Sequence, residues 1–332
     1  MTTSIMEQEA RQAPAVIAQQ LTENRAQCEI IGKKLQKLSP KLVMIIGRGS
    51  SDHAGVFGKY LIEIETGVPT CSASPSVTSV YGKQLQLADT LVIVISQSGR
   101  SPDILAQAQM AKDAGAYCIA LVNDEQSPLA ALVDDVLPLK AGVEQSVAAT
   151  KSYLSTLSAL LQLTAYWSNN QSLMSALIQL PQALTKMLEQ PAQLTPEAMN
   201  GVANMVVLGR GLGYAIAKEM ALKLKEICSI HAEAFSSAEF LHGPVTLVEQ
   251  GLLILDCQVN DESARSHQQQ ITEVVTRGAQ IIHLQQIDAA IHARIAPLVV
   301  LQRFYLDVAN VAVNRGFNPD QPKGLKKVTQ TL

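Results

Sequence analysis

The chain has 332 residues, of which 47% are hydrophobic, 17% charged and 4% aromatic. This length suits two domains with Ala, Leu, Val and Ile cores, and the composition excludes a disordered or fibrous chain. The formal net charge of -3 argues against a surface that binds nucleic acid or an anionic membrane along the whole protein. We therefore expect a soluble globular protein with neither of those partners.

The cysteines and the N-terminus indicate the compartment. Five scattered cysteines, none in a C-x-x-C pair, argue against a disulfide framework and against a cysteine-based zinc site. The first residues lack the basic-then-apolar pattern of a signal peptide, and no apolar run approaches the roughly 18 residues of a membrane span. We expect a cytoplasmic protein that holds no metal and no other cofactor.

The first half of the chain alternates between helical and β-rich patterns. Residues 4–38 carry apolar side chains at helical spacing, interrupted by Pro14, and predict lead-in helices. From residue 41, short apolar runs followed by Gly/Ser turns and helical stretches predict parallel βαβ units with helices on both faces. Helical segments are expected from 143 to about 167, followed by a linker or turn at 168–172.

A second copy of this pattern begins after residue 172. Gly47-Arg48-Gly49 recurs as Gly209-Arg210-Gly211, and the segments 114–116 and 277–279 each precede a β-rich run. The copies differ after their second predicted strand. The first copy has the serine-rich segment 96–101 there, and the matching segment of the second copy, 256–261, contains no serine. We expect two diverged copies of one α/β unit that divide the functional labour.

The stretch from 219 to 243 gathers acid, base and cation. On a helix, Glu219, Lys223, Glu226 and Ile230 form one stripe, and a neighbouring stripe reaches His231. Glu219 and Lys223 alone would be an ordinary i, i+4 surface pair. The acids and histidines that follow stand among Ala, Ser, Phe and Leu, which predicts partial burial and hence a functional role. These residues are His231, Glu233, Glu239 and His242.

The serine-rich loops predict an anion site. Segment 96–101 offers three serines, a glycine and Arg100 before Pro102, which suits the first turn of a helix. Ser50 and Ser51 follow the preceding strand and can add hydroxyl groups. Two such loops in one βαβ unit favour a phosphate monoester site over the alternative of simple turns and helix caps.

Nucleotide and metal sites fit the sequence less well. The dinucleotide fingerprint G-x-G-x-x-G is broken at Asp52 in one copy and at Tyr214 in the other, and no P-loop sequence occurs. His231-x-Glu233 resembles the start of a zinc deaminase motif, but no P-C-x-x-C follows it.

Several of these motifs together resemble the double SIS (sugar isomerase) family, and in particular the isomerase half of glucosamine-6-phosphate synthases. The resemblance implies an α/β fold of two tandem doubly wound, flavodoxin-like parallel-sheet domains with helices on both faces. The expected boundaries are a helical lead-in at 1–38, SIS domains at 39–172 and 173–315, and an active-site tail at 316–332. The motifs that carry the resemblance are residues 47–54, 95–101, 146–152, 209–244 and 320–332.

The resemblance also implies roles for individual residues. Glu226 would move a proton between C1 and C2 of the sugar, and Glu219 and Lys223 would position the sugar and this carboxylate. His242, supplied by the neighbouring subunit of a homodimer, would assist ring opening together with Lys327. The residues implied to hold the sugar phosphate or line its site are Ser51, Ser96, Gln97, Ser98, Ser101 and Val147.

The sequence departs from the synthases in two ways. Met1 is followed by Thr2, and about 40 residues precede the first sugar-binding unit, so we expect no glutaminase domain. Without glutamine-derived ammonia, we expect the reaction to run as deamination of glucosamine 6-phosphate to fructose 6-phosphate and ammonia. Arg100 replaces an acidic residue usual in the family, which leaves the exact substrate open.

Other functions stay open at this stage. Among enzymes they are a deglycase acting on a 6-phosphorylated fructosamine and a phosphosugar isomerase that releases no ammonia. A sugar-phosphate sensor without catalysis is the alternative of another class, but residues 1–38 show no basic recognition helix. A nicotinamide dehydrogenase fits least, because the dinucleotide fingerprint is broken.

Overall fold

The computed structural model describes residues 3–327, apart from the side chains of residues 249 and 250. Of the predicted tail at 316–332, residues 328–332 lie outside the described residues. The chain forms two compact units, each built on one parallel sheet. Within residues 3–327, the first-sheet unit comprises residues 15–144, 151–179 and 326–327, and the second-sheet unit comprises the rest. The domain boundaries at 38, 172 and 315 stay a prediction.

Two helices lead into the first sheet. They are α1 (Ile5–Glu23) and α2 (Arg25–Leu38). The expected interruption at Pro14 is wrong, because α1 continues through this residue. A proline inside a helix removes one backbone hydrogen bond. Here the fully buried Ala13 and Ile17 pack on either side of it, and this burial supports the helix.

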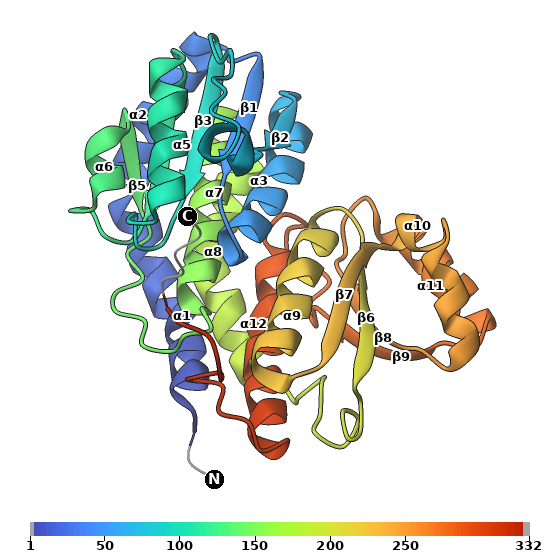
Figure 1. Cartoon of the computed structure of the whole chain (residues 1–332). Coiled ribbons are helices and arrows are strands. Elements are labelled where there is room, and N and C mark those ends of the chain that lie inside the picture. Colours follow the sequence, from blue (N-terminus) through green and yellow to red (C-terminus); the bar gives the residue numbers. More distant parts are fainter. Residues whose placement is uncertain (1–2, 328–332) are drawn as a thin grey trace. The chain divides into compact units, whose positions relative to one another are not determined.

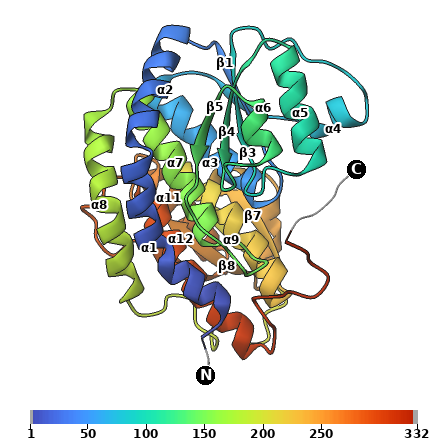
Figure 2. The same ribbon diagram turned by 90° about the vertical axis from the view of Figure 1, so that its left-hand side faces the viewer.

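The first sheet has five parallel strands in the order β2-β1-β3-β4-β5, the flavodoxin-like order. Figure 2 shows α5 and α6 on one side of these strands and α3 and α7 on the other. The strands are β1 (Leu42–Ile46), β2 (Thr70–Ser72), β3 (Thr90–Ile95), β4 (Tyr117–Val122) and β5 (Asp135–Pro138). The helices are α3 (Ser50–Thr66), α4 (Pro75–Ser79), α5 (Pro102–Asp113), α6 (Pro128–Leu132), α7 (Lys151–Trp167) and α8 (Gln171–Leu188).

The predicted central strands are confirmed. Every residue of β3 is buried, as a strand covered on both faces requires. On one face Val92 and Val94 pack with Ile104 of α5, and on the other Ile45 faces α3 and Leu160 of α7. The carboxyl ends of β1 and β3 therefore lead into α3 and α5 at the same edge of the sheet.

The expected helix from 143 begins later, at Lys151. Segment 143–150 forms no helix, because several of its backbone N–H groups donate hydrogen bonds to residues far away in the sequence. The N–H groups of Gln145 and Ser146 donate to the carboxylate of Glu9 at 2.5 and 3.1 Å. The expected linker or turn at 168–172 is a turn at Ser168 and Asn169, and it is shorter than expected, since α8 already begins at Gln171.

The second sheet has four parallel strands in the order β7-β6-β8-β9. Figure 1 shows α9 and α12 on one side of β6 and β7, and α10 and α11 on the other. The strands are β6 (Asn204–Gly209), β7 (His231–Ser236), β8 (Leu253–Gln258) and β9 (Gln280–Gln285). The helices are α9 (Leu212–Cys228), α10 (Ser237–Phe240), the 3₁₀ helix η1 (Pro244–Gln250), α11 (Ala264–Thr276) and α12 (Ala296–Asn314).

The two sheets confirm that the chain contains two copies of one α/β arrangement. The turn after the first strand is the same in both, since Gly49 has φ 53° and ψ -128° and Gly211 has φ 53° and ψ -124°. The strand register corrects the sequence match by two residues. Ile46 pairs with Val94 and Leu208 with Asp256, so Ser96 corresponds to Gln258 and not to Asp256.

The central stretch is helical only as far as Cys228. Ser229 takes the left-handed conformation at φ 53°, and His231 then pairs with Asn204 as the first residue of β7. The helical stripe that the sequence predicted through His231 is therefore wrong in its last turn. The predicted partial burial is also wrong for four residues that the structure leaves exposed, which are His231, Glu233, Glu239 and His242.

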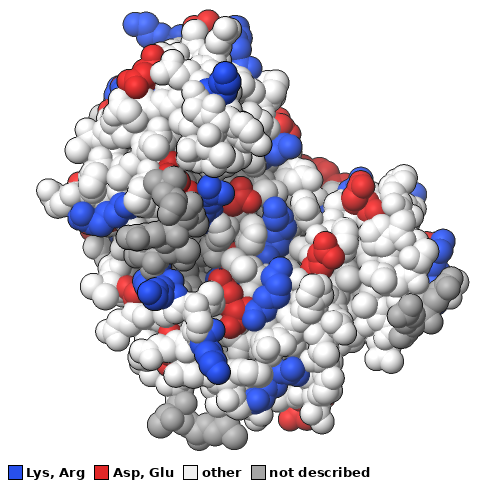
Figure 3. Space-filling view, in the orientation of Figure 1, with Lys and Arg blue, Asp and Glu red and all other residues white. Residues whose placement is uncertain are grey.

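One helix within residues 3–327, α12, is long and apolar enough to cross a membrane by length and composition. It carries Arg303 and Asp307, and 89% of its apolar window is buried inside the protein. A core helix of a globular unit has the same properties. On the face shown in Figure 3, acidic and basic side chains are interspersed, without a large basic surface.

Candidate active site

Helix α9 carries a buried cluster of one lysine and two glutamates. Lys223 Nζ lies 3.0 Å from Glu219 Oε1 and 2.8 Å from Glu226 Oε2. The side chains of Glu219 and Lys223 are 0% and 2% exposed, and that of Glu226 is 22% exposed. The spacings i, i+4 and i, i+3 place all three on one face of the helix. Glu219 and Lys223 therefore form a buried ion pair and not the surface ion pair that their spacing alone would suggest.

The cluster keeps Lys223 charged. Burial by itself would lower the pKa of Lys223, but the negative charges of Glu219 and Glu226 outweigh it and raise the pKa above its ordinary value. A permanently charged ammonium then fixes the position of the Glu226 carboxylate. Among the described residues, Oε1 of Glu226 has no hydrogen-bond partner. This oxygen can accept a proton from a bound ligand.

The serine-rich loops of the first-sheet unit form a second cluster. Ser51 lies in the first turn of α3, Ser96 follows β3, and Ser101 precedes α5. These residues line one cavity of about 410 Å³ at the carboxyl edge of the sheet. The sequence-predicted residues in its lining are Ser51, Ser96, Gln97, Ser98, Ser101 and Lys327, and the others are Arg48, Gly49, Ile95, Asp103 and Ile104.

The loop after β3 has a fixed shape. The Oγ of Ser96 accepts a hydrogen bond from the N–H of Gly99 at 3.2 Å. Gly99 has φ 62°, and a Cβ atom at this position would lie 2.3 Å from the Oγ of Ser127. Only glycine fits there, because the conformation and the close approach both exclude a side chain. These contacts fix the shape of the loop beside the cavity.

Arg100 does not take part in this cavity as the sequence suggested. Its Nη2 lies 2.7 Å from Asp124 Oδ2, and its side chain is absent from the cavity lining. Arg48 lines the cavity instead, with its Nε 2.9 Å from Oδ2 of the buried Asp103. Sequence reasoning missed this pair, because its two residues stand 55 positions apart in the chain.

Lys327 lies at the same cavity. Its Nζ is 3.3 Å from Oε2 of Glu144, whose side chain is 0% exposed. Glu144 also accepts a hydrogen bond from the Ser152 hydroxyl at 2.5 Å. Sequence reasoning missed Glu144, although it stands two residues before the SVAATKS motif that carried the family resemblance.

Two predicted residues have other surroundings. Val147 belongs to the second-sheet unit and donates its N–H to the carbonyl of Asp320 at 2.9 Å. His242 is exposed in the turn after α10, and its N–H bonds to the carbonyl of Glu239. Nothing in the chain by itself tests their roles, which stay predictions along with those of the other site residues.

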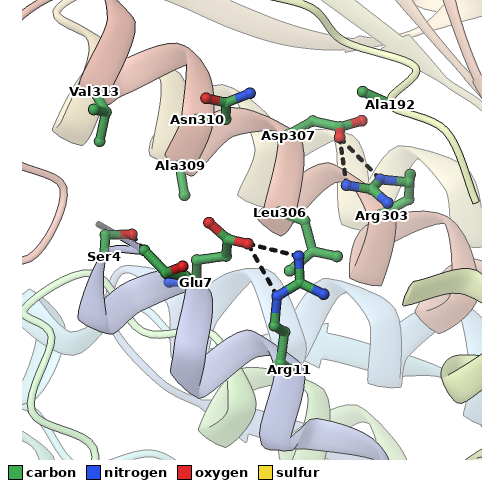
Figure 4. A pocket seen from close by; sticks show the side chains of 11 residues that line it. Ser4, Glu7, Arg11, Ala192, Arg303, Leu306, Asp307, Ala309, Asn310 and Val313 are labelled. Carbon is green, nitrogen blue, oxygen red and sulfur yellow. Dashed lines mark hydrogen bonds and ion pairs between the residues drawn. The ribbon is translucent and has the colours of Figure 1, made fainter. Parts of the chain in front are cut away.

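A separate cavity of about 290 Å³ lies between α1 and α12 in the second-sheet unit and contains no predicted site residue. Figure 4 shows two ion pairs in its wall, Glu7 with Arg11 and Arg303 with Asp307. Burial raises the pKa of Asp307 although Arg303 opposes this effect.

The equivalent edge of the second sheet has different chemistry. A cavity of about 250 Å³ there is lined mainly by carboxamides, and its lining includes no lysine or arginine. Asp256 is buried beneath it, 2.7 Å from Nε2 of His267 and 2.9 Å from Nδ1 of His283. The two copies thus differ in what their edges can bind, as the sequence predicted.

A family model described as SIS domain matches residues 38–166 and 199–296. The chain belongs to the SIS domain family. The two matched segments contain every strand of the two parallel sheets. This confirms the resemblance that the motifs predicted.

Relatives of this SIS protein include aminotransferases. The glutamine–fructose-6-phosphate aminotransferase [isomerizing] of Clostridium tetani is 33% identical over 329 residues, covering 90% of this chain and 53% of the relative. The chain spans about half the length of the curated relatives it matches.

Solved structures of SIS proteins share the fold. A protein described as a candidate phosphosugar isomerase from Silicibacter pomeroyi is 35% identical, with a TM-score of 0.89, covering 96% of this chain and 100% of that one. The C-terminal domain of glucosamine-fructose-6-phosphate aminotransferase from Francisella tularensis is 27% identical, with a TM-score of 0.84, covering 97% and 99%.

Proposed function

We propose that this SIS protein is a phosphosugar isomerase that deaminates glucosamine 6-phosphate, a reaction that would take place in the cytoplasm. The observation that carries the proposal is the Glu226 carboxylate, held at one oxygen by the buried Lys223 and uncommitted at the other. Proton transfer between adjacent carbons needs one fixed carboxylate within reach of both. The names of the relatives, which act on fructose 6-phosphate or are described as phosphosugar isomerases, support the substrate class.

The reaction balances without a cofactor. Glu226 removes the proton from C2 of the open-chain amino aldose, and an enolamine forms between C1 and C2. Return of the proton to C1 gives the ketose imine at C2. Water then adds to this imine and ammonia leaves, so that glucosamine 6-phosphate and water become fructose 6-phosphate and ammonia.

The remaining roles follow from the resemblance. The residues that would bind the phosphate are Ser51, Ser96, Gln97, Ser98 and Ser101. His242 and Lys327 would open the sugar ring by moving a proton from the C1 hydroxyl to the ring oxygen. Support for the phosphate role comes from the shared cavity of the serines and Lys327.

The experiment is to incubate purified protein with glucosamine 6-phosphate and to measure ammonia and fructose 6-phosphate together. The proposal requires equal amounts of both products, and their loss in Glu226→Gln. Lys225→Gln serves as the matched control, because Lys225 is an exposed residue of the same helix. If the protein instead converts glucose 6-phosphate to fructose 6-phosphate and releases no ammonia from glucosamine 6-phosphate, it is a phosphosugar isomerase without deaminase activity. If it turns over only fructosamine 6-phosphates, it is a deglycase.

The proposal includes a homodimer in which His242 acts on the partner's substrate. Mixing a Glu226→Gln variant with a His242→Asn variant tests this directly. If the two residues come from different subunits, random exchange restores about a quarter of the wild-type activity, because half of the dimers regain one intact site. If both act from the same subunit, mixing restores none.

A further inference from the structure

The serine-lined cavity, where we propose that the sugar phosphate binds, needs a cation, because its serine side chains carry no charge. Its serine hydroxyls and backbone N–H groups are neutral, whereas a phosphate monoester carries up to two negative charges near neutral pH. The charged residues in the lining are Arg48, Asp103 and Lys327. Of these, Asp103 is itself an acid, and the single side-chain nitrogen of Lys327 lies beside the buried Glu144. Arg48 also has an acid beside it, but its guanidinium has two nitrogens besides the one that lies next to Asp103. Arg48 is therefore the cation to consider.

The contact of Arg48 with Asp103 uses only Nε and leaves the two terminal nitrogens of the guanidinium available to a ligand. Its Nε lies 2.9 Å from Oδ2 of Asp103, which is 2% exposed, while the Arg48 side chain is 48% exposed. Within the described part of the chain, neither Nη1 nor Nη2 has a hydrogen-bond partner. These two groups form the planar fork that binds two oxygens of one phosphate.

The backbone around Arg48 is constrained on both sides. A Cβ atom on Gly47 would lie 2.8 Å from the backbone of Ser51, and Gly49 has φ 53°. Arg48 is thus presented from a tight turn whose position relative to α3 is fixed. In the second copy, the equivalent turn at Gly211 faces the carboxylate of Asp261, 3.7 Å from the site of an added Cβ. An acid at that place disfavours an anion.

We propose that Arg48, oriented by Asp103, is the residue that makes this cavity specific for phosphorylated over unphosphorylated sugars. The inference rests on the proposed function for the substrate class. It adds a residue outside the set implied by the family resemblance, and it assigns Asp103 the role of a positioning residue. Arg100, the cation that the loop sequence suggested, has no part in this recognition.

Calorimetric titration with fructose 6-phosphate, with inorganic phosphate and with fructose tests the inference without requiring turnover. Arg48→Gln is expected to lower the affinity for both phosphate-bearing probes by about tenfold or more, since a charge-assisted hydrogen bond is lost. The weak affinity for fructose is expected to stay unchanged, which a general structural defect would not allow. Arg100→Gln is the matched control and is expected to stay within about twofold of the wild type for every probe.

Removing Arg48 leaves the carboxylate of Asp103 buried without this partner, so Arg48→Gln could unfold the first-sheet unit. The double variant Arg48→Gln/Asp103→Asn removes both charges and keeps the test valid. Asp103→Asn alone retains the guanidinium but not its orientation, and a smaller loss of phosphate affinity is expected.

The outcomes separate this inference from the proposed function. If the wild type binds fructose 6-phosphate but releases no ammonia, and the Arg48 variants lose binding, the inference stands and deamination is wrong. Wild-type affinity in both Arg48→Gln and the double variant overturns the inference, whatever the reaction. If the wild type binds neither phosphate-bearing probe, the inference and the phosphosugar substrate are both wrong.

Discussion

The ammonium group of Lys327 lies 3.3 Å from the carboxylate of Glu144, a residue 183 positions earlier in the chain. The side chain of Glu144 is fully buried and also accepts a hydrogen bond from Ser152. A buried carboxylate thus places the end of the described chain at the wall of the serine-lined cavity. This contact gives Lys327 a defined position among the basic residues of the tail.

Replacing Lys327 with methionine should slow ammonia release from glucosamine 6-phosphate by about a hundredfold or more, because the acid–base group that we propose for ring opening is lost. The measurement is kcat from coupled detection of ammonia. Lys326→Met is the control, since Lys326 is exposed and adjacent. Equal rates for the two variants would show that Lys327 has no specific role in catalysis and affects the rate only through its charge, as the exposed Lys326 does.

Lys223→Met should lower the free energy of unfolding by about 3–5 kcal/mol, because Glu219 and Glu226 lose their shared cation. The triple variant with Gln at both glutamate positions should regain part of this stability. Urea denaturation followed by circular dichroism measures both, and Lys225→Met on the same helix is the control. A triple variant less stable than Lys223→Met would contradict a charge-based explanation.

Gly99→Ala and Gly82→Ala separate backbone strain from steric conflict. Their φ angles are 62° and 60°, but only at Gly99 would a Cβ atom meet other atoms within 4 Å. Gly82→Ala should cost about 1 kcal/mol, the usual penalty for this conformation. Gly99→Ala should cost clearly more and should weaken fructose 6-phosphate binding, as measured by thermal unfolding and calorimetry. Equal costs would show that the loop moves freely.

The thiols should differ in reactivity. Burial raises the pKa of Cys28 and of Cys228 to about 12, and it also raises the pKa of the half-buried Cys71. At pH 8 a disulfide reagent should therefore label Cys71 slowly and the four buried cysteines only after denaturation. Cys71→Ser should abolish labelling of the native protein. Rapid labelling of that variant would indicate local opening of a core.

Local patterns sufficed for most of the fold. The apolar run of β3 and the glycine turns at 47–49 and 209–211 are encoded within a few residues, so strands and duplication could be predicted. The end of α9 could not, because the left-handed residue is Ser229 and not a glycine. Pairing of His231 with β6 supplies the reason for the break, and that pairing is not local in sequence.

The candidate site was predictable in part for the same reason. The spacing of Glu219, Lys223 and Glu226 predicted that they meet, but the burial of Lys223 depends on the packing of the whole unit. The partnerships of Arg48 with Asp103 and of Lys327 with Glu144 join residues 55 and 183 positions apart. Periodicity within one helix cannot indicate such pairs.

The shared turn at Gly49 and Gly211 separates architecture from chemistry within a single molecule. The second copy keeps the backbone conformation to within a few degrees in φ and ψ, although carboxamides and acids replace the serines beside it. The turn is therefore a requirement of the strand-to-helix connection, whatever lies next to it. Side chains beside such a turn can therefore change at little cost to folding, so that the same backbone can come to present different binding groups.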